Sequence, residues 1–175
     1  MKTKRGFTLV ELMVALGIFS IVVLLASGAY LMMISIARKS QGVSTGIDNL
    51  TFALEIMTRN IRTGTSYACG SGGDCAITPG DSFSFRNSNG ILVEYRLAGS
   101  VLVENRGGVE RPLTDAMVDI SRLNFYVVGT AQTPGDYLQP HVLIVVEGRV
   151  SSDARTQDTF HVQTSATMRG SDIGT

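Results

Sequence analysis

The sequence predicts an α+β protein in which one long N-terminal helix, first membrane-spanning and then amphipathic, packs on a C-terminal antiparallel β-sheet. Three observations predict this arrangement. A run of apolar residues without charge lies near the N-terminus, and an apolar pattern of helical period continues beyond it. The segments after Gly80 alternate apolar with polar residues, which is typical of strands. One face of the helix is therefore expected to cover one face of the sheet.

The composition describes a chain of modest size with little charge. Its 175 residues include 15 Lys and Arg against 15 Asp and Glu, so the formal net charge at pH 7 is zero. This length allows one domain with an accessory segment, and the charge balance lacks the basic excess of an electrostatic nucleic-acid binder. Hydrophobic residues make up 44% and charged residues 17%, which is more apolar than a typical soluble domain. Contact with lipid or with a partner is therefore expected.

Residues Leu12 to Ala37 contain no charged side chain. The run exceeds the roughly 20 residues that a helix needs to cross a bilayer. The preceding residues Lys2, Lys4 and Arg5 predict a cytoplasmic N-terminus with the rest of the chain exported. A secretory signal peptide cleaved near Ala26 to Ala29 is the alternative, but the apolar run continues past that point.

Glu11 is the one acidic residue in the apolar N-terminal segment. A carboxylate near the bilayer centre costs about 2.5 to 3.5 kcal/mol on insertion scales, and less near the interface. Cleavage between Gly6 and Phe7 would create an α-ammonium, and Glu11 would share its helix face at i+4. That ion pair could form within one chain, or it could join two subunits and fix their register.

The segment Lys4 to Leu12, with the sequence KRGFTLVEL, resembles the class III signal and methylation motif of type IV pilins and type II secretion pseudopilins. The resemblance implies that prepilin peptidase cleaves after Gly6 and N-methylates Phe7. It also implies that Glu11 assists assembly by meeting the N-terminus of a neighbouring subunit. The apolar helix would first anchor the subunit in the membrane and later pack in the filament core. An uncleaved single-span anchor is the alternative.

The helical pattern continues beyond the membrane-spanning run. An apolar seam recurs at helical spacing through Ile47, Leu50, Leu54, Met57 and Ile61. Glycines interrupt the helix and predict local bending or melting, or else close packing, at Gly17, Gly28, Gly42 and Gly46. The expected organisation is a leader at residues 1–6, a transmembrane and filament-core helix at 7–37, an amphipathic continuation at 38–64 and an exported β-rich head at 65–175.

The stretch from Thr65 to Gly80 is rich in Gly and Ser and contains both cysteines. In an exported domain, Cys69 and Cys75 are expected to close a small surface loop as a disulfide, with free thiols as the alternative. Major pilins typically carry their disulfide-bounded loop near the C-terminus. A loop that directly follows the helix therefore argues against a major pilin.

The remainder predicts strands and turns. A hairpin is expected from Phe83 and Phe85 through the turn at residues 87–90 into the alternating segment Ile91 to Leu97. Further strands are expected at Val101 to Glu104, Val118 to Val128, Val142 to Val146 and Thr159 to Met168. The predicted loops are Gly107 to Gly108, Gly129 to Pro140 and Ser151 to Asp158.

No pattern predicts catalysis, a metal site or a cofactor. His141 and His161 lack the G-x-S-x-G context of a hydrolase nucleophile. Two cysteines and two histidines cannot form a four-ligand cage without carboxylates. The loop aspartates show no EF-hand spacing, and they are Asp74, Asp81, Asp136 and Asp153. We expect a protein that is not an enzyme and that binds no metal.

The expected function is that of a structural minor pilin or pseudopilin subunit, at or near the tip of a type IV pilus or type II secretion pseudopilus. The segments Leu54 to Arg62 and Phe160 to Arg169 resemble larger minor pilins and a tip pseudopilin. The alternative is a membrane-anchored extracytoplasmic module whose Gly129 to Pro140 loop binds DNA, a secreted substrate or a surface. An envelope enzyme ranks third.

The resemblance implies three kinds of partner: prepilin peptidase, other pilin or pseudopilin subunits, and the inner-membrane assembly platform. It implies a single-pass inner-membrane protein with a cytoplasmic N-terminus and an extracytoplasmic head, which later joins a filament in the periplasm or at the cell surface. Nucleic acid is expected as a partner only if the filament belongs to a DNA-uptake system, because the chain has no basic excess and no aromatic residues are interleaved with Arg38, Lys39, Arg59 and Arg62. These four are expected to form intersubunit ion pairs or to face solvent.

Overall fold

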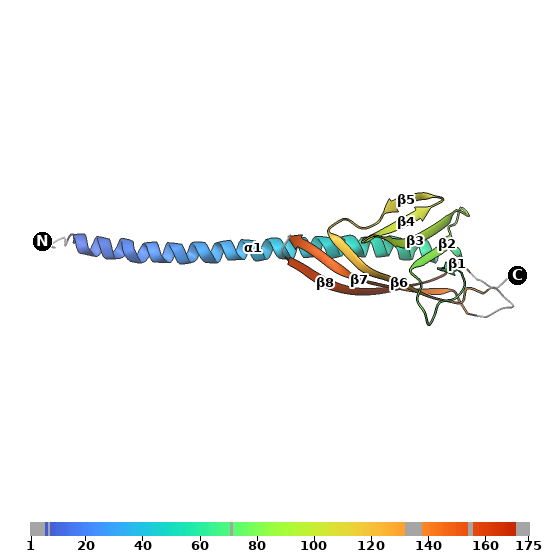
Figure 1. The fold of residues 1–175 in the computed structure, drawn as a ribbon. Coiled ribbons are helices and arrows are strands. Elements are labelled where there is room, and N and C mark those ends of the chain that lie inside the picture. Colours follow the sequence, from blue (N-terminus) through green and yellow to red (C-terminus); the bar gives the residue numbers. More distant parts are fainter. Residues whose placement is uncertain (1–5, 7, 71, 132–137, 154–155, 171–175) are drawn as a thin grey trace. The chain divides into compact units, whose positions relative to one another are not determined.

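The structure is a computed structural model that describes residues 6, 8–70, 72–131, 138–153 and 156–170 (Figure 1). Phe7, Asp136 and the basic residues of the predicted leader lie outside the described residues. The described residues form one helix and eight strands: α1 (Leu9–Arg62), β1 (Thr65–Cys69), β2 (Ser82–Arg86), β3 (Leu92–Ala98), β4 (Val101–Arg106), β5 (Val109–Pro112), β6 (Val118–Val128), β7 (His141–Asp153) and β8 (Thr156–Thr167). The long helix and the antiparallel strands give the α+β layout that the sequence predicts.

The chain divides into two compact units, Met1–Ser40 and Gln41–Thr175. The first unit holds the N-terminal part of α1. The second unit, called the head below, holds the rest of α1 and all eight strands. The second unit includes the amphipathic part of α1, because that part supplies residues to its core. The predicted division into a leader, a membrane-spanning helix, an amphipathic continuation and a head stays a prediction.

Within the head, the strands form two antiparallel sheets instead of the single sheet that the sequence predicted. The first sheet has the order β1-β2-β3-β4-β5, and the second has the order β6-β7-β8. An isolated bridge joins Gly80, in the segment before β2, to Phe125 on β6. The rings of Phe83 and Phe125 lie 5.6 Å apart, so the core is also continuous across the two sheets.

The predicted hairpin is present as β2 and β3. Phe83 pairs with Tyr95, and Phe85 pairs with Val93, all four on the buried face. The strands β1 and β5 were not predicted. The first is short and lies next to glycine-rich sequence, and all four residues of β5 are exposed, so neither shows a clear alternation.

The predicted loop from Ser151 to Asp158 is too long. Strand β7 continues to Asp153, and β8 begins at Thr156. The two strands pair antiparallel from His141 opposite Thr167 to Asp153 opposite Thr156. Polar residues here obscured the strand pattern, because backbone pairing with a neighbouring strand does not require apolar side chains.

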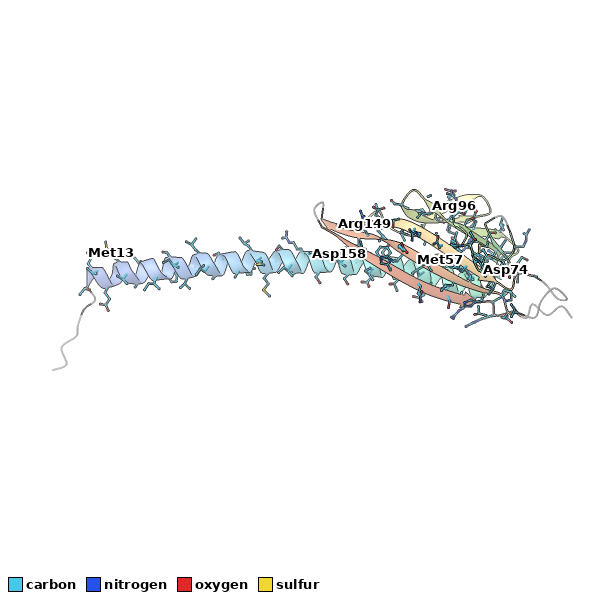
Figure 2. The ribbon with its side chains drawn as sticks, turned by 60° about the horizontal axis from the view of Figure 1, so that its bottom comes forward. Met13, Met57, Asp74, Arg96, Arg149 and Asp158 are labelled. Carbon is cyan, nitrogen blue, oxygen red and sulfur yellow. A yellow bond between two sulfur atoms is a disulfide. The ribbon has the colours of Figure 1, made fainter. Side chains whose placement is uncertain are left out.

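The predicted helix seam forms one wall of the core. Leu50, Leu54, Met57 and Ile61 are buried, and Ile47 is partly buried against them. Figure 2 shows Met57 on the part of α1 that lies against the strands. The opposite wall is formed mainly by inward-facing aromatic and branched aliphatic residues of the two sheets.

Helix α1 is continuous through all four glycines, so the expected melting is not observed. Gly46 is buried, and a Cβ at this position would lie 2.3 Å from Cγ1 of Val150 on β7. No atom lies within 4 Å of a Cβ built at Gly17 or Gly28. Close packing, the alternative that the sequence left open, therefore explains Gly46.

A buried polar network attaches α1 to the first sheet. The Asn60 side chain donates a hydrogen bond to the Tyr95 hydroxyl at 3.1 Å, and that hydroxyl donates to Glu104 at 3.4 Å. Glu104 is itself buried and pairs with Arg106 at 2.8 Å. Burial, followed by the nearby Glu104 carboxylate, raises the pKa of Tyr95, so its hydroxyl stays protonated and can donate.

Candidate processing and assembly site

Thr8 caps the N-terminus of α1. Its hydroxyl oxygen accepts a hydrogen bond from the backbone N–H of Glu11 at 3.3 Å, and its carbonyl oxygen accepts one from the N–H of Leu12 at 3.2 Å. Thr8 is therefore the N-cap residue, and Glu11 occupies the third helical position. This spacing is that of a capping box, in which a Glu at the third position supports the start of a helix.

Glu11 is an exposed carboxylate in the first turn of α1. Within the part of the chain that the structure describes, no side chain forms an ion pair with it. Helix dipoles favour negative charge at this end, so the position suits a carboxylate even without a counter-ion. The Glu11 side chain remains available to an ammonium group from outside the described residues.

Gly6 precedes the capped helix and is exposed. No atom lies within 4 Å of a Cβ built at this position, so the backbone is open to an enzyme. Phe7, the predicted methylation site, lies outside the described residues. Hydrolysis of the bond after Gly6 would leave only Phe7 and Thr8 ahead of α1, which puts the new ammonium group near the start of the helix.

The first half of α1 presents apolar side chains around its whole circumference. Its exposed large apolar residues are Leu9, Val10, Leu12, Met13, Val14, Leu16, Ile18, Phe19, Ile21, Val22, Val23, Leu24, Leu25, Tyr30, Leu31, Met32, Met33 and Ile36. This helix is long and apolar enough to cross a membrane, and its most apolar window has no buried residue. A helix that is apolar on all sides needs lipid or other helices around it.

The serine hydroxyls in this part of α1 are satisfied within the helix. Ser20 donates to the carbonyl of Leu16 at 2.8 Å, and Ser27 donates to the carbonyl of Val23 at 2.8 Å. Ser35 bonds to the carbonyl three residues before it, at 2.7 Å. These internal hydrogen bonds reduce the cost of placing hydroxyl groups in hydrocarbon.

The disulfide between Cys69 and Cys75 is present, with a Cα–Cα distance of 6.1 Å. The loop that it closes is attached to β6, because the N–H of Cys75 donates to the carbonyl of Val127 at 2.9 Å. Gly80 and Phe125 exchange two backbone hydrogen bonds, each of 2.9 Å. The residues following the disulfide therefore cover part of the outer edge of β6.

Asp74 attaches this loop to the end of β6. Its carboxylate accepts hydrogen bonds from the backbone N–H groups of Gly129 and Thr130, at 3.1 and 2.8 Å, and from the Thr130 hydroxyl at 2.7 Å. Partial burial raises the pKa of Asp74, but the hydrogen bonds from Thr130 and Gly129 outweigh it, so the pKa is lowered. Asp74 thus has a structural role.

The two histidines lie far apart within the second sheet. His141 on β7 contacts the Thr167 hydroxyl at 3.0 Å, whereas His161 on β8 pairs with Glu147 at 3.7 Å. Glu147 lies six positions beyond His141 on β7, which corresponds to about 20 Å. The two imidazoles therefore do not meet. No group of three or more His, Cys, Asp or Glu side chains that could hold a metal ion occurs among the described residues.

The structural roles of several residues were not predicted from the sequence. Thr8 could have been found, because T-x-x-E before an apolar run is a helix-start signature. The contacts of Asp74 with Thr130 and of Tyr95 with Glu104 carried no such signal, since each depends on how the strands pair.

Comparison with known families identifies the N-terminal segment. Residues 1–27 match the family described as the prokaryotic N-terminal methylation motif. The matched residues include Gly6, Phe7 and Glu11 and extend into the uncharged part of α1. No curated protein and no solved structure matches the chain.

Proposed function

We propose, from the N-terminal methylation motif characteristic of type IV pilin-like proteins that residues 1–27 carry, that this chain is a minor pilin or pseudopilin subunit. It joins a type IV pilus or type II secretion pseudopilus at or near the tip and has a structural role without catalysis. The motif implies processing by prepilin peptidase and assembly with other pilin subunits. The helix and motif together suggest membrane anchoring.

The observation that carries the proposal is the continuity between the motif and the apolar helix. The matched segment contains the capped start of α1, and the helix continues as an apolar surface on all sides. A helix of this kind suits two successive environments, a bilayer before assembly and a bundle of similar helices afterwards. In the proposed topology, the N-terminus is cytoplasmic and the head is extracytoplasmic.

Glu11 would pair with the ammonium group that processing creates. Cleavage after Gly6 places a positive charge near the positive end of the helix dipole of α1, which is electrostatically unfavourable. The Glu11 carboxylate offsets this charge, either within one chain or between subunits. N-methylation of Phe7 retains the positive charge of the amine, so the ion pair survives the modification.

The test replaces Glu11 by Gln and measures two properties of the full chain in cells that contain the filament machinery. We expect N-terminal cleavage to continue and copurification with other filament subunits to fall about tenfold. The reason is that assembly would shield the ion pair of Glu11 from water, so that losing one partner weakens the contact between subunits. The control is Glu110→Gln, which removes an exposed ion pair with Arg96 on the first sheet. Unchanged copurification of the Glu11→Gln protein would contradict this role for Glu11.

A further inference from the structure

The C-terminal end of α1 forms one side of a small cleft of about 200 Å³. The backbone N–H of Arg169 donates to the carbonyl of Arg62 at 2.9 Å, which holds the segment after β8 against the end of the helix. The cleft is lined by Glu55, Thr58, Arg59, Arg62, Thr63 and Arg169. Three arginines and one glutamate therefore surround the same space.

The cleft has an excess of positive charge. Arg59 pairs with Glu55 at 3.1 Å, but within the described residues neither Arg62 nor Arg169 forms a side-chain ion pair. The guanidinium groups are not needed to cap the helix. The carbonyl of Ile61 already accepts from Gly64 N–H at 2.9 Å and from the Tyr67 hydroxyl at 2.6 Å. The arrangement suits a carboxylate ligand, which arginine binds through two parallel hydrogen bonds.

The other end of the head carries two acidic side chains, Asp48 and Asp115, and the Asp115 carboxylate accepts a hydrogen bond from the backbone N–H of Met117 at 3.0 Å. Asp48 is exposed on α1, and the backbone N–H of Asp115 donates to the adjacent Asn49 side chain at 2.9 Å. No ion pair involves Asp48 or Asp115 among residues that the structure describes. Asp48 and Arg62 lie fourteen positions apart on α1, which corresponds to about 21 Å along the helix axis. In Figure 2, Asp74 marks the Arg62 end of the head, and Arg149 and Asp158 lie toward the opposite end.

We propose that the arginine cleft, defined by Arg59, Arg62 and Arg169, binds the acidic end of a second copy of this chain, defined by Asp48 and Asp115. The proposal rests on the proposed function, because insertion through N-terminal helices makes all copies point the same way. When heads of the same direction stack along the α1 segment that each head contains, the Arg62 end of one head faces the Asp48 end of the next. The contact is heterologous, and it requires two adjacent copies, which a position near the tip allows and a single terminal subunit does not.

A protein carboxylate fits the cleft better than the backbone of a nucleic acid. The space of about 200 Å³ admits one small anionic group, and the Glu55 carboxylate in its wall would repel a continuous row of phosphates. Aromatic residues for base stacking are absent from the lining. The acidic partner surface, in contrast, is present on the same chain.

Chemical crosslinking of the full chain tests the proposed contact. Thr63 lies in the cleft, and Thr51 lies on the exposed face of α1 one turn beyond Asp48, so both are replaced by Cys in one chain. No free cysteine competes among the described residues. The two new thiols are about 18 Å apart along α1, which a short bismaleimide linker cannot bridge within one chain. We expect crosslinked dimers from the double variant and none from either single variant.

Charge reversal in the Thr51→Cys, Thr63→Cys chain tests the chemistry of the contact. We expect Arg62→Glu with Arg169→Glu to lower the dimer yield about tenfold, and Asp48→Arg with Asp115→Arg to do the same. All four reversals together should restore the yield, since each end then meets its new complement. The matched control is Arg86→Glu with Arg111→Glu, two exposed arginines on the first sheet, which should leave the yield unchanged.

Three results would overturn the inference. One is the absence of dimers although the chain is processed and copurifies with filament subunits. Another is a dimer yield that falls on charge reversal and is not recovered in the variant with all four reversals. That result would mean that the cleft binds a different subunit. The third is binding of a short DNA duplex that requires Arg62 and Arg169 while crosslinking does not. Failure of processing and copurification would instead contradict the proposed function. The copies would then have no reason to point in the same direction.

Discussion

Gly46 on α1 and Val150 on β7 are so close that a single added carbon would collide with the strand. A Cβ at Gly46 would lie 2.3 Å from Cγ1 and 3.1 Å from Cγ2 of Val150. Valine cannot easily move these atoms, because its branched side chain is restricted at χ1. The glycine therefore sets the distance between the helix and the second sheet of the head.

We expect Gly46→Ala to destabilise the head by about 1 to 3 kcal/mol, the usual cost of overpacking, although alanine favours helix formation. Thermal unfolding followed by circular dichroism measures the change. Adding Val150→Ala to Gly46→Ala should recover part of the loss by making room. An unchanged unfolding temperature in the Gly46→Ala protein would show that α1 and β7 are not in close contact at this point.

Replacing both Cys69 and Cys75 by Ser should lower the free energy of unfolding by about 2 kcal/mol, the loop-entropy value for a closed loop of this size. Chemical denaturation in the presence and absence of reductant measures this loss. The reductant should destabilise the native protein but leave the double variant unaffected. Equal stability of the reduced and oxidised native proteins would contradict a stabilising role.

The lowered pKa of Asp74 predicts a stability contribution that is lost in acid. A carboxyl group whose pKa is lower in the folded state stabilises the protein above its unfolded value, here 3.8. That contribution disappears as the pH falls from about this value through the folded pKa. We expect native protein to be more stable than Asp74→Asn at pH 6, with the difference shrinking below about pH 4.

Urea denaturation at several pH values measures the Asp74 effect. Amide hydrogen exchange at Gly129 and Thr130 offers a local readout, because both N–H groups donate to the Asp74 carboxylate. A stability difference that stayed constant down to pH 2 would mean that ionisation of Asp74 is not responsible for it.

Tyr95→Phe should cost about 1 to 2 kcal/mol of stability, because Asn60 and Glu104 lose a buried hydrogen-bonding partner. The matched control is Tyr126→Phe, a partly buried tyrosine on β6 that has no side-chain hydrogen bond among the described residues. Denaturant unfolding compares the two variants. Equal effects of the two substitutions would indicate that the Asn60–Tyr95–Glu104 network contributes little.

The sequence predicted those parts of the fold in which each residue's environment depends on its near neighbours. The helix seam from Ile47 to Ile61 was visible because residues three and four positions apart share a face. The hairpin of β2 and β3 was visible because Phe83 and Phe85 alternate with polar residues ahead of a turn. Both features are local patterns.

Other parts depend on contacts between distant segments. Strand β5 is fully exposed, and its pairing with β4 leaves no apolar pattern to detect. The sequence pattern around Gly46 indicates a helix breaker, because its contact with Val150 on β7 joins segments that are distant in sequence. The arginine cleft likewise joins Arg62 to Arg169, which are distant in sequence and meet only because β8 ends beside the end of α1.

The candidate processing site is a short linear segment, and its processing stays a prediction. Gly6, Phe7 and Glu11 belong to one motif of adjacent residues, so no tertiary contact is needed to identify them. The structure adds the capping role of Thr8, which fixes the start of α1 two residues after the expected cleavage point.

The mass of the mature chain shows directly whether the N-terminal motif is processed. The full sequence is expressed with a prepilin peptidase, and its N-terminus is determined by intact and top-down mass spectrometry. We expect a chain that begins at Phe7 and carries one added methyl group on its terminal amine. A chain that begins near Ala29, or one that retains Met1, would contradict the proposed function, because neither can enter a pilin-type assembly pathway.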